Sequence, residues 1–92
     1  MGEAAEPPGQ IERWVIEACR ELKLPIATVE DDIFDAGGTS LTIIRLIART
    51  ETEFGADLLS PDDIVDASSV RGIAATIRRN MPHPDVAATN GG

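Results

Sequence analysis

Residues 31–41 read Asp-Asp-Ile-Phe-Asp-Ala-Gly-Gly-Thr-Ser-Leu, an acidic stretch that stops at two glycines and a serine. Glycine frees the backbone for positive φ and removes side-chain bulk, so Gly37 and Gly38 predict a sharp approach into the segment that follows. Serine is a favoured N-cap, and Ser40 stands directly before an apolar periodic segment. The same position would suit an exposed hydroxyl that another protein modifies. The pattern alone leaves both interpretations open.

A helix is expected over residues 40–54, because apolar side chains recur there at three-and-four spacing and Gly55 is a typical stop. Its inward face consists of Ile43, Leu46, Ile47, Thr50 and Phe54. A second apolar strip lies beside Ser40, and a helix with two apolar faces in a small protein suggests a docking surface. The predicted docking residues are Leu41, Ile44, Arg45 and Ala48, with Arg49 on the same side.

Three further helices are expected from the same apolar spacing and from capping residues. Their predicted ranges are 10–22, 61–66 and 69–79, and the short middle one begins with a serine cap followed by proline. Aromatic residues make up only 3% of the chain and Tyr is absent, so the core must come from aliphatic side chains. The sequence therefore predicts an all-α four-helix bundle in which a long loop, 23–39, joins the first two helices.

The predicted loop is long for a compact domain, so it must pack against the core or carry a function. We expect four apolar side chains of the loop to pack against the core; these are Ile26, Val29, Ile33 and Phe34. Four acidic side chains should stay in water; these are Glu30, Asp31, Asp32 and Asp35. The acids resemble a calcium loop, but Ile33 occupies a ligand position in the best register. No metal site is predicted.

Composition excludes several classes of function. The net charge of −8 and the pI near 4.4 argue against binding to nucleic acid, which depends on clustered Lys and Arg. No apolar run approaches the roughly 20 residues that span a bilayer. The N-terminus lacks the basic and apolar regions of a signal peptide, and one Cys cannot form an internal disulfide. We therefore expect a cytoplasmic monomer with neither nucleic-acid nor membrane partners.

The two ends of the chain are rich in Pro, Gly and Ala. Such segments have little apolar surface to bury, so they predict a disordered leader over residues 1–9 and a disordered tail over residues 80–92. One domain, residues 10–79, remains between them.

No autonomous catalyst is predicted. A hydrolase built on Ser40 needs a positioned base, yet the single His, His83, lies in the predicted tail. The serine also lacks the second glycine of a Gly-x-Ser-x-Gly elbow. Cys19 lies on the apolar face of the first helix, where a thiol usually behaves as a small hydrophobe. What remains is a hydroxyl at a helix N-terminus, where an attached phosphate would meet the favourable end of the helix dipole.

Residues 31–41 resemble the attachment motif of peptidyl carrier proteins, the thiolation domains of nonribosomal peptide synthetases. Further matches cover roughly residues 10–79 and are Trp14, Arg45, Phe54-Gly55 and Ile73-Ala74. The resemblance implies an acyl-carrier-like four-helix bundle without catalytic residues of its own. It also implies that Ser40 receives 4′-phosphopantetheine from coenzyme A. The flanking residues of the motif are Gly37, Gly38 and Thr39.

The resemblance implies partners as well. A phosphopantetheinyl transferase would attach the arm with the help of magnesium, an adenylation enzyme would load an aminoacyl group onto its thiol, and condensation or tailoring enzymes would follow. Because the chain starts at Met1 and contains one domain, we expect a free-standing (type II) carrier. The departures from the family pattern are Ile33-Phe34 for two aromatics, Ala36 for Leu, Thr50 for an aliphatic residue and Ser68-Ser69 for Pro-Thr. They should make the core smaller or more polar without affecting the reaction at Ser40.

Two alternatives stay open. An acyl carrier of fatty-acid or polyketide synthesis shares the fold and the arm, but it more typically has Asp directly before the modified serine and an acidic second helix. Here Thr39 holds that place, and Arg45 and Arg49 line the docking side, which favours the peptidyl class. The other alternative is an unmodified acidic interaction domain, in which residues 37–40 are only a turn and a cap.

Overall fold

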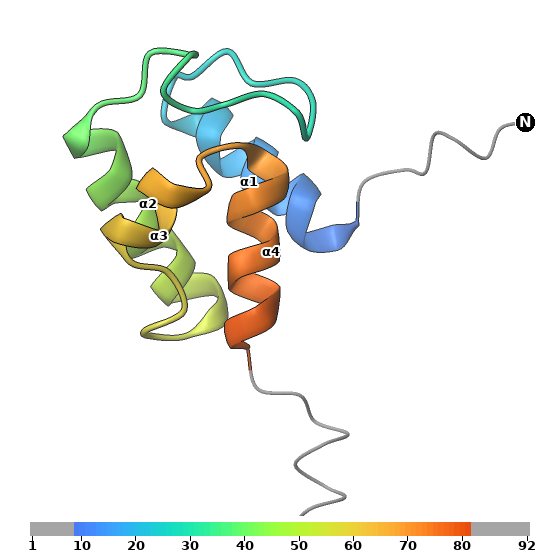
Figure 1. Ribbon diagram of the computed structural model, residues 1–92, viewed down its shortest axis with the longest axis vertical. Helices are drawn as coiled ribbons and strands as arrows, with labels where there is room; N and C mark the ends of the chain where they lie inside the picture. The colour runs from blue at the N-terminus through green and yellow to red at the C-terminus, as the bar shows by residue number, and fades with distance from the viewer. Residues whose placement is uncertain (1–8, 82–92) are drawn as a thin grey trace, which may run out of the picture.

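The computed structural model describes residues 9–81, which fold into four α-helices joined by loops (Figure 1). The helices are α1 (Gln10–Glu21), α2 (Ser40–Phe54), α3 (Pro61–Asp66) and α4 (Val70–Asn80). The predicted all-α architecture is confirmed, and only three helix ends differ from the sequence-based ranges, each by one residue. Within residues 9–81 no helix has the length and apolar character needed to cross a bilayer.

The predicted leader and tail lie outside the described residues, apart from Gly9, Asn80 and Met81. The prediction is wrong for the last two. Asn80 completes α4, and its side-chain amide donates a hydrogen bond of 3.0 Å to the carbonyl of Leu58. Met81 is partly buried against the core. The helix therefore continues one residue beyond its last arginine because a tertiary contact stabilises its end.

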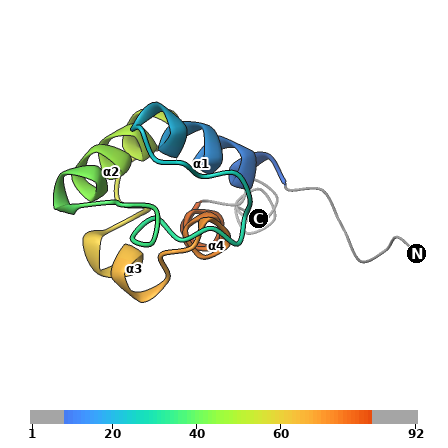
Figure 2. The same ribbon diagram turned by 90° about the horizontal axis from the view of Figure 1, so that it is seen from above.

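Helix α4 forms the largest helix–helix contact of the described residues, with α1. It packs against α1 and against α3, while α2 contacts α1 and α3 from the other side (Figure 2). Four apolar residues on its inward face are fully buried; they are Val70, Ile73, Ala74 and Ile77. The core is aliphatic, as the composition predicted. One aromatic contact supplements it, because the rings of Trp14 and Phe54 meet edge to face with centroids 4.9 Å apart.

The helix ends are closed by the predicted devices. Ser60 caps α3 in a reciprocal capping box with Asp63, and Pro61 follows at the first helical position. Ser69 caps α4 by accepting a hydrogen bond of 3.0 Å from the backbone N–H of Gly72. Because a cap residue lies outside the helix it caps, α4 begins at residue 70 and not at 69.

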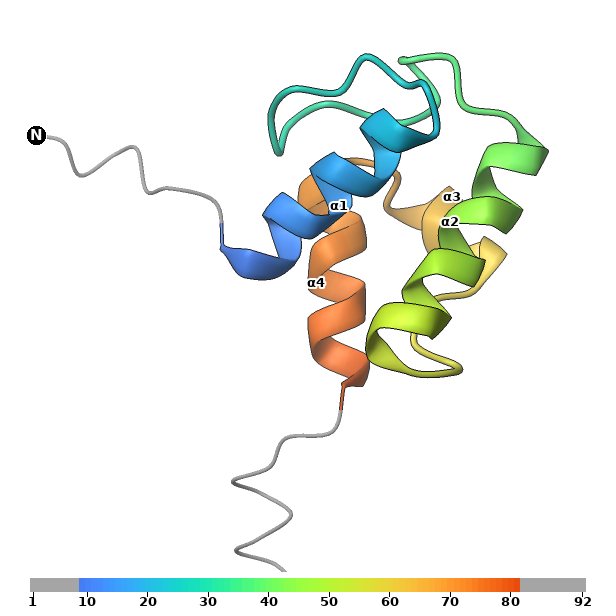
Figure 3. The same cartoon turned by 180° about the vertical axis from the view of Figure 1, so that it is seen from behind.

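The loop between α1 and α2 passes over the end of the bundle at which α4 begins (Figure 3). Three backbone hydrogen bonds hold it against the α3–α4 linker and the first turn of α4: Ile33 N–H to Ser68 O at 3.0 Å, Val70 N–H to Asp31 O at 2.9 Å and Arg71 N–H to Val29 O at 2.9 Å. Ile26 and Ile33 are buried, as predicted. Phe34 corrects the prediction, because 40% of it is exposed: it lies in a tight turn that directs only its neighbour Ile33 into the core.

Candidate functional site

The residue that caps α2 is Thr39 and not Ser40, which corrects the sequence-based cap. The Thr39 hydroxyl accepts a hydrogen bond of 3.4 Å from the N–H of Thr42, and the Thr42 hydroxyl accepts one of 3.1 Å from the N–H of Thr39. Thr and Ser are both good caps, and this pairing of two threonine side chains decides between them. Ser40 is consequently the first residue inside the helix.

Ser40 is exposed, and its hydroxyl makes no hydrogen bond with any residue of the described range. The capping role that would have occupied it is already performed by Thr39. The hydroxyl stands in the first turn of α2, where unpaired backbone N–H groups and the positive end of the helix dipole favour a negative group. A phosphate attached here would therefore be stabilised and would displace no structural contact.

The two glycines before the site are needed for different reasons. Gly37 has a φ of 103°, a left-handed conformation that side chains rarely adopt. Gly38 allows a close approach: its N–H donates a 2.7 Å hydrogen bond to Ile33 O, and an added Cβ would lie 2.7 Å from the same oxygen. Together they form the sharp approach to the helix that the sequence predicted.

Two of the loop acids, Asp31 and Asp32, lie at the surface as predicted, but their carboxylates also accept hydrogen bonds that order the loop. One carboxylate oxygen of Asp31 accepts hydrogen bonds from the N–H groups of Ala27, at 2.7 Å, and Thr28, at 2.9 Å. These two bonds lower the pKa of Asp31. Among residues 9–81 no cluster of His, Cys, Asp or Glu side chains is arranged to hold a metal ion.

Asp32 is bound more extensively. Its carboxylate accepts a hydrogen bond from the Ser68 hydroxyl and two more from the N–H groups of Phe34 and Asp35. The bond from Ser68 is the main cause of the lowered pKa of Asp32; partial burial opposes it, and the two backbone donors add to it.

The predicted docking strip on α2 is exposed. Leu41 is 55% exposed and Ile44 is 61% exposed, and Ala48 and Arg45 also face solvent. Helix α3 adds an exposed apolar side chain that the prediction did not place, since Val65 is 62% exposed. A helix of six residues is too short for periodicity to show which of two adjacent apolar residues, Ile64 or Val65, faces the core.

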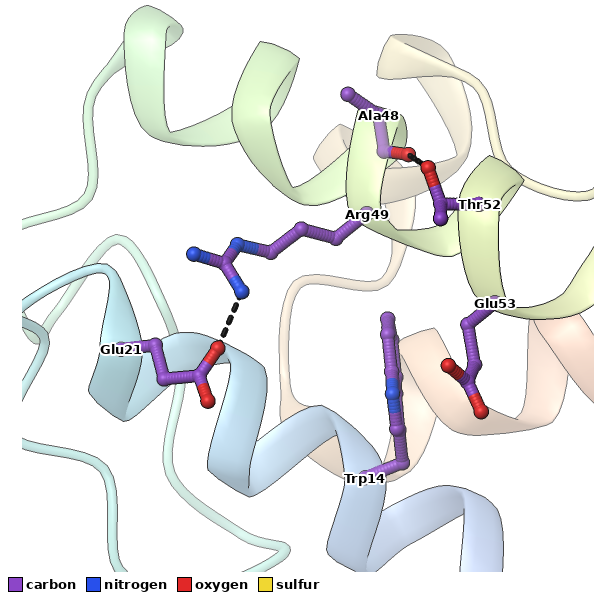
Figure 4. Close-up of a pocket in the computed structure, with 6 residues that line it drawn as sticks. All are labelled: Trp14, Glu21, Ala48, Arg49, Thr52 and Glu53. Atoms are coloured by element: carbon purple, nitrogen blue, oxygen red, sulfur yellow. Dashed lines mark hydrogen bonds and ion pairs between the residues drawn. The ribbon is translucent and has the colours of Figure 1, made fainter.

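Arg49 turns away from this strip. Its guanidinium forms an ion pair with Glu21 at the end of α1 (Figure 4). The pair closes one side of a shallow groove of about 430 Å³ between α1 and α2, and the indole of Trp14 stands between the pair and Glu53. Arg49 therefore tethers two helices, while Arg45 is exposed on α2.

These features define a class of protein. A small helical bundle presents an uncommitted serine hydroxyl at the start of a helix, beside an exposed apolar strip, and residues 9–81 contain no histidine to activate it. Such a domain is built to be modified and handled by other proteins.

Comparison with known proteins agrees with this class. A family model described as "Phosphopantetheine attachment site" matches residues 14–77, which include the whole site. The chain belongs to this family of non-catalytic carrier domains, whose cofactor is covalently attached 4′-phosphopantetheine. The exposed hydroxyl of Ser40 fits that group, because it is free of structural bonds and lies at a helix N-terminus.

The similar proteins are much larger than this chain. The chain is 34% identical over 88 residues to nonribosomal peptide synthetase kk1B of Curvularia clavata, covering 95% of itself and 1% of that protein. It is 34% identical over 71 residues to syringomycin synthase SyrB1 of Pseudomonas syringae pv. syringae, covering 76% of itself and 11% of that protein. It is 36% identical over 75 residues to an isonitrile lipopeptide synthase of Mycobacterium tuberculosis, covering 80% of itself and 3% of that protein. The chain thus corresponds to one small part of each.

Proposed function

We propose that Ser40 carries the 4′-phosphopantetheine arm and that the chain is a peptidyl carrier of nonribosomal peptide synthesis. The observation that carries the proposal is the exposed Ser40 hydroxyl, which takes no part in capping α2 because Thr39 performs that role. The names of the relatives, which include a nonribosomal peptide synthetase, support the peptidyl class. The arm would hold an aminoacyl or peptidyl group as a thioester.

The attachment is a phosphoryl transfer to Ser40. The hydroxyl loses its proton, its oxygen bonds to the phosphorus that bears the pantetheine group of coenzyme A, and 3′,5′-ADP leaves. The transferase would supply the base that takes this proton and would hold the magnesium ion. The chain contributes an accessible nucleophile and a helix N-terminus that favours the phosphodiester formed.

The chain's own thiol cannot replace the arm. Cys19 is fully buried, and burial raises the pKa of its thiol to about 11. A buried thiol that stays protonated at neutral pH is neither accessible nor nucleophilic. The reactive thiol has to be imported on the arm, and the chain acts as a substrate of its partners and not as an enzyme. An adenylation enzyme and later condensation or tailoring enzymes would be those partners.

The partners would dock on the exposed strip of α2. Leu41 and Ile44 supply apolar surface close to Ser40, and Arg45 supplies a positive charge beside them. An apolar contact next to the modified residue would let different enzymes approach the arm in the same orientation. An acidic group on the partner surface would complement Arg45.

The test is intact-protein mass spectrometry of the full chain after incubation with coenzyme A, magnesium and a broad-specificity phosphopantetheinyl transferase. We expect one added 4′-phosphopantetheine on the wild-type chain and none on Ser40→Ala. Ser60→Ala is the matched control, because it changes another serine at a helix start and should be modified like the wild type. No addition to the wild type, or addition that survives Ser40→Ala, would refute the proposal.

A further inference from the structure

The carboxylate of Asp32 joins two segments that lie far apart in the sequence. Its Oδ1 accepts hydrogen bonds from the backbone N–H of Phe34 at 2.8 Å and of Asp35 at 3.2 Å. Its Oδ2 accepts the hydroxyl of Ser68, in the linker between α3 and α4. One side chain therefore connects the α3–α4 linker to the loop that leads to Ser40. We call this arrangement the Asp32–Ser68 latch.

The turn that the latch holds ends next to the candidate attachment site. Within the turn, the N–H of Ala36 bonds to Asp32 O at 3.0 Å, and the N–H of Gly38 bonds to Ile33 O at 2.7 Å. Gly38 is followed directly by Thr39, the cap of α2, and then by Ser40. The Asp32 carboxylate thus holds the turn from which the chain enters α2, together with the backbone bonds of the same loop.

Ser68 is the part of the latch that ties the Asp32 carboxylate to the α3–α4 linker. The N–H groups of Phe34 and Asp35 hold one carboxylate oxygen within the turn. The Ser68 hydroxyl binds the other oxygen, so the turn is joined to the linker through this side chain as well as through the backbone bond from Ile33 N–H to Ser68 O.

We propose that Ser68 and Asp32 are positioning residues for the modification of Ser40: Ser68 fixes the Asp32 carboxylate, and the carboxylate fixes the turn that presents the serine. The inference rests on the proposed function of Ser40. Without the latch the turn samples several orientations, and only a fraction of the molecules offers Ser40 in the form the transferase accepts. The apparent affinity falls by that fraction, while the bound complex reacts as before.

The decisive variant is Ser68→Ala in the full chain, assayed with coenzyme A and a broad-specificity phosphopantetheinyl transferase. We expect the KM for the carrier to rise about 3- to 10-fold while kcat changes less than about 2-fold, as a loss of the binding-competent fraction requires. Ser68→Thr keeps the hydroxyl and should restore the wild-type KM.

The neighbouring serine supplies a matched control. Ser69→Ala removes the N-cap bond to Gly72, so it weakens the same linker without touching Asp32. It should lower stability but leave the KM at its wild-type value. A second readout is independent of modification: amide hydrogen exchange of Phe34 and Asp35 should become faster in Ser68→Ala and stay unchanged in Ser69→Ala.

The outcomes distinguish failure of the positioning role from failure of the proposed function of Ser40. A KM that is unchanged in Ser68→Ala, or raised equally in Ser69→Ala, overturns the positioning role even though Ser40 is modified. If the wild-type chain accepts no arm, the proposed function fails, and the exchange rates of Phe34 and Asp35 still decide whether Ser68 orders the turn. Unchanged exchange in Ser68→Ala overturns the latch itself.

Discussion

Arg78 near the end of α4 reaches Glu12 in the first turn of α1, and its Nη2 lies 2.8 Å from Glu12 Oε1. Glu12 is only 13% exposed, so its burial alone raises the pKa of the carboxyl. The hydrogen bond from Arg78, backbone N–H donors and the charge of the guanidinium outweigh burial, and the net pKa lies below its usual value. The pair therefore ties the two helices that form the largest contact of the bundle.

The first prediction concerns this pair and pH. A carboxyl whose pKa is lowered by folding stabilises the protein above its unfolded pKa, and the contribution disappears as pH falls through the folded value. Glu12→Gln should lower the free energy of unfolding at pH 7 by about 0.5–1 kcal/mol, since one partner of the pair is exposed. Urea unfolding at several pH values should show the difference from wild type shrinking as the pH falls below about 4.5, because the Glu12 carboxyl then becomes protonated in the folded protein too.

Asp31 and Asp32 have lowered pKa values too. Both residues are present in wild type and variant, so their pH-dependent contributions to the free energy of unfolding cancel in the difference. Glu17→Gln is the control, because Glu17 is an exposed residue of the same helix. It should change stability by less than about 0.5 kcal/mol at every pH. A difference between wild type and Glu12→Gln that does not shrink as the pH falls would contradict the assigned role of the charge.

The second prediction concerns Thr50, which is 1% exposed in the core. Its hydroxyl donates a 2.9 Å hydrogen bond to Leu46 O, a carbonyl that also accepts the helical backbone bond, so the polar group is satisfied within its own helix. Thr50→Val removes a hydroxyl without leaving an unpaired acceptor and adds a buried methyl group. The free energy of unfolding should rise by about 0.5–1 kcal/mol, measured by urea denaturation.

Thr52 is the matched control for this change. Its hydroxyl makes the same type of bond, 3.1 Å to Ala48 O, but its side chain is exposed. Thr52→Val should therefore change the free energy of unfolding by less than about 0.5 kcal/mol. Equal stabilisation by both variants would mean that burial of the methyl group at position 50 is not the cause.

Most of the fold could be predicted from the sequence because its determinants are local. The apolar spacing of Val70, Ile73 and Ile77 and the serine caps at positions 60 and 69 act within a few residues, and they set the helix ends to within one residue. The glycines before Ser40 were identified in the same way. What was missed depends on which side chains meet in space.

The cap of α2 is the clearest case. Ser and Thr have similar cap preferences, and Thr39 is selected by a side chain inside the helix, Thr42, that no general rule singles out. Arg49 was placed on the docking side because its position on α2 allows that, but Glu21 of α1 draws it away. The role of Asp32 was hidden because its main partner, Ser68, is distant in the sequence.

The third prediction concerns how many thiol groups of the folded protein are accessible to a reagent, before and after the arm is attached. Because Cys19 is fully buried and its pKa is raised to about 11, the folded chain without the arm should react very slowly with Ellman's reagent at pH 8. Guanidinium should expose the one cysteine of the sequence. After phosphopantetheinylation the folded protein should gain one fast-reacting thiol, and Cys19→Ala should keep it. Fast reaction of the folded, unmodified chain would show that Cys19 is accessible.

The last prediction tests the strip on α2. Ile44 is 61% exposed, so Ile44→Glu should leave the free energy of unfolding within about 0.5 kcal/mol of wild type. In an apolar contact beside the proposed attachment site, a new carboxylate would be desolvated without a partner. We expect kcat/KM for loading of the phosphopantetheinylated chain by an adenylation enzyme that accepts the wild type to fall about 10-fold. Val65→Glu on α3 places the same charge at a similarly exposed apolar residue, 62%, outside the strip. Equal slowing by both variants would attribute the effect to added charge, and unchanged loading in Ile44→Glu would remove α2 as the docking surface.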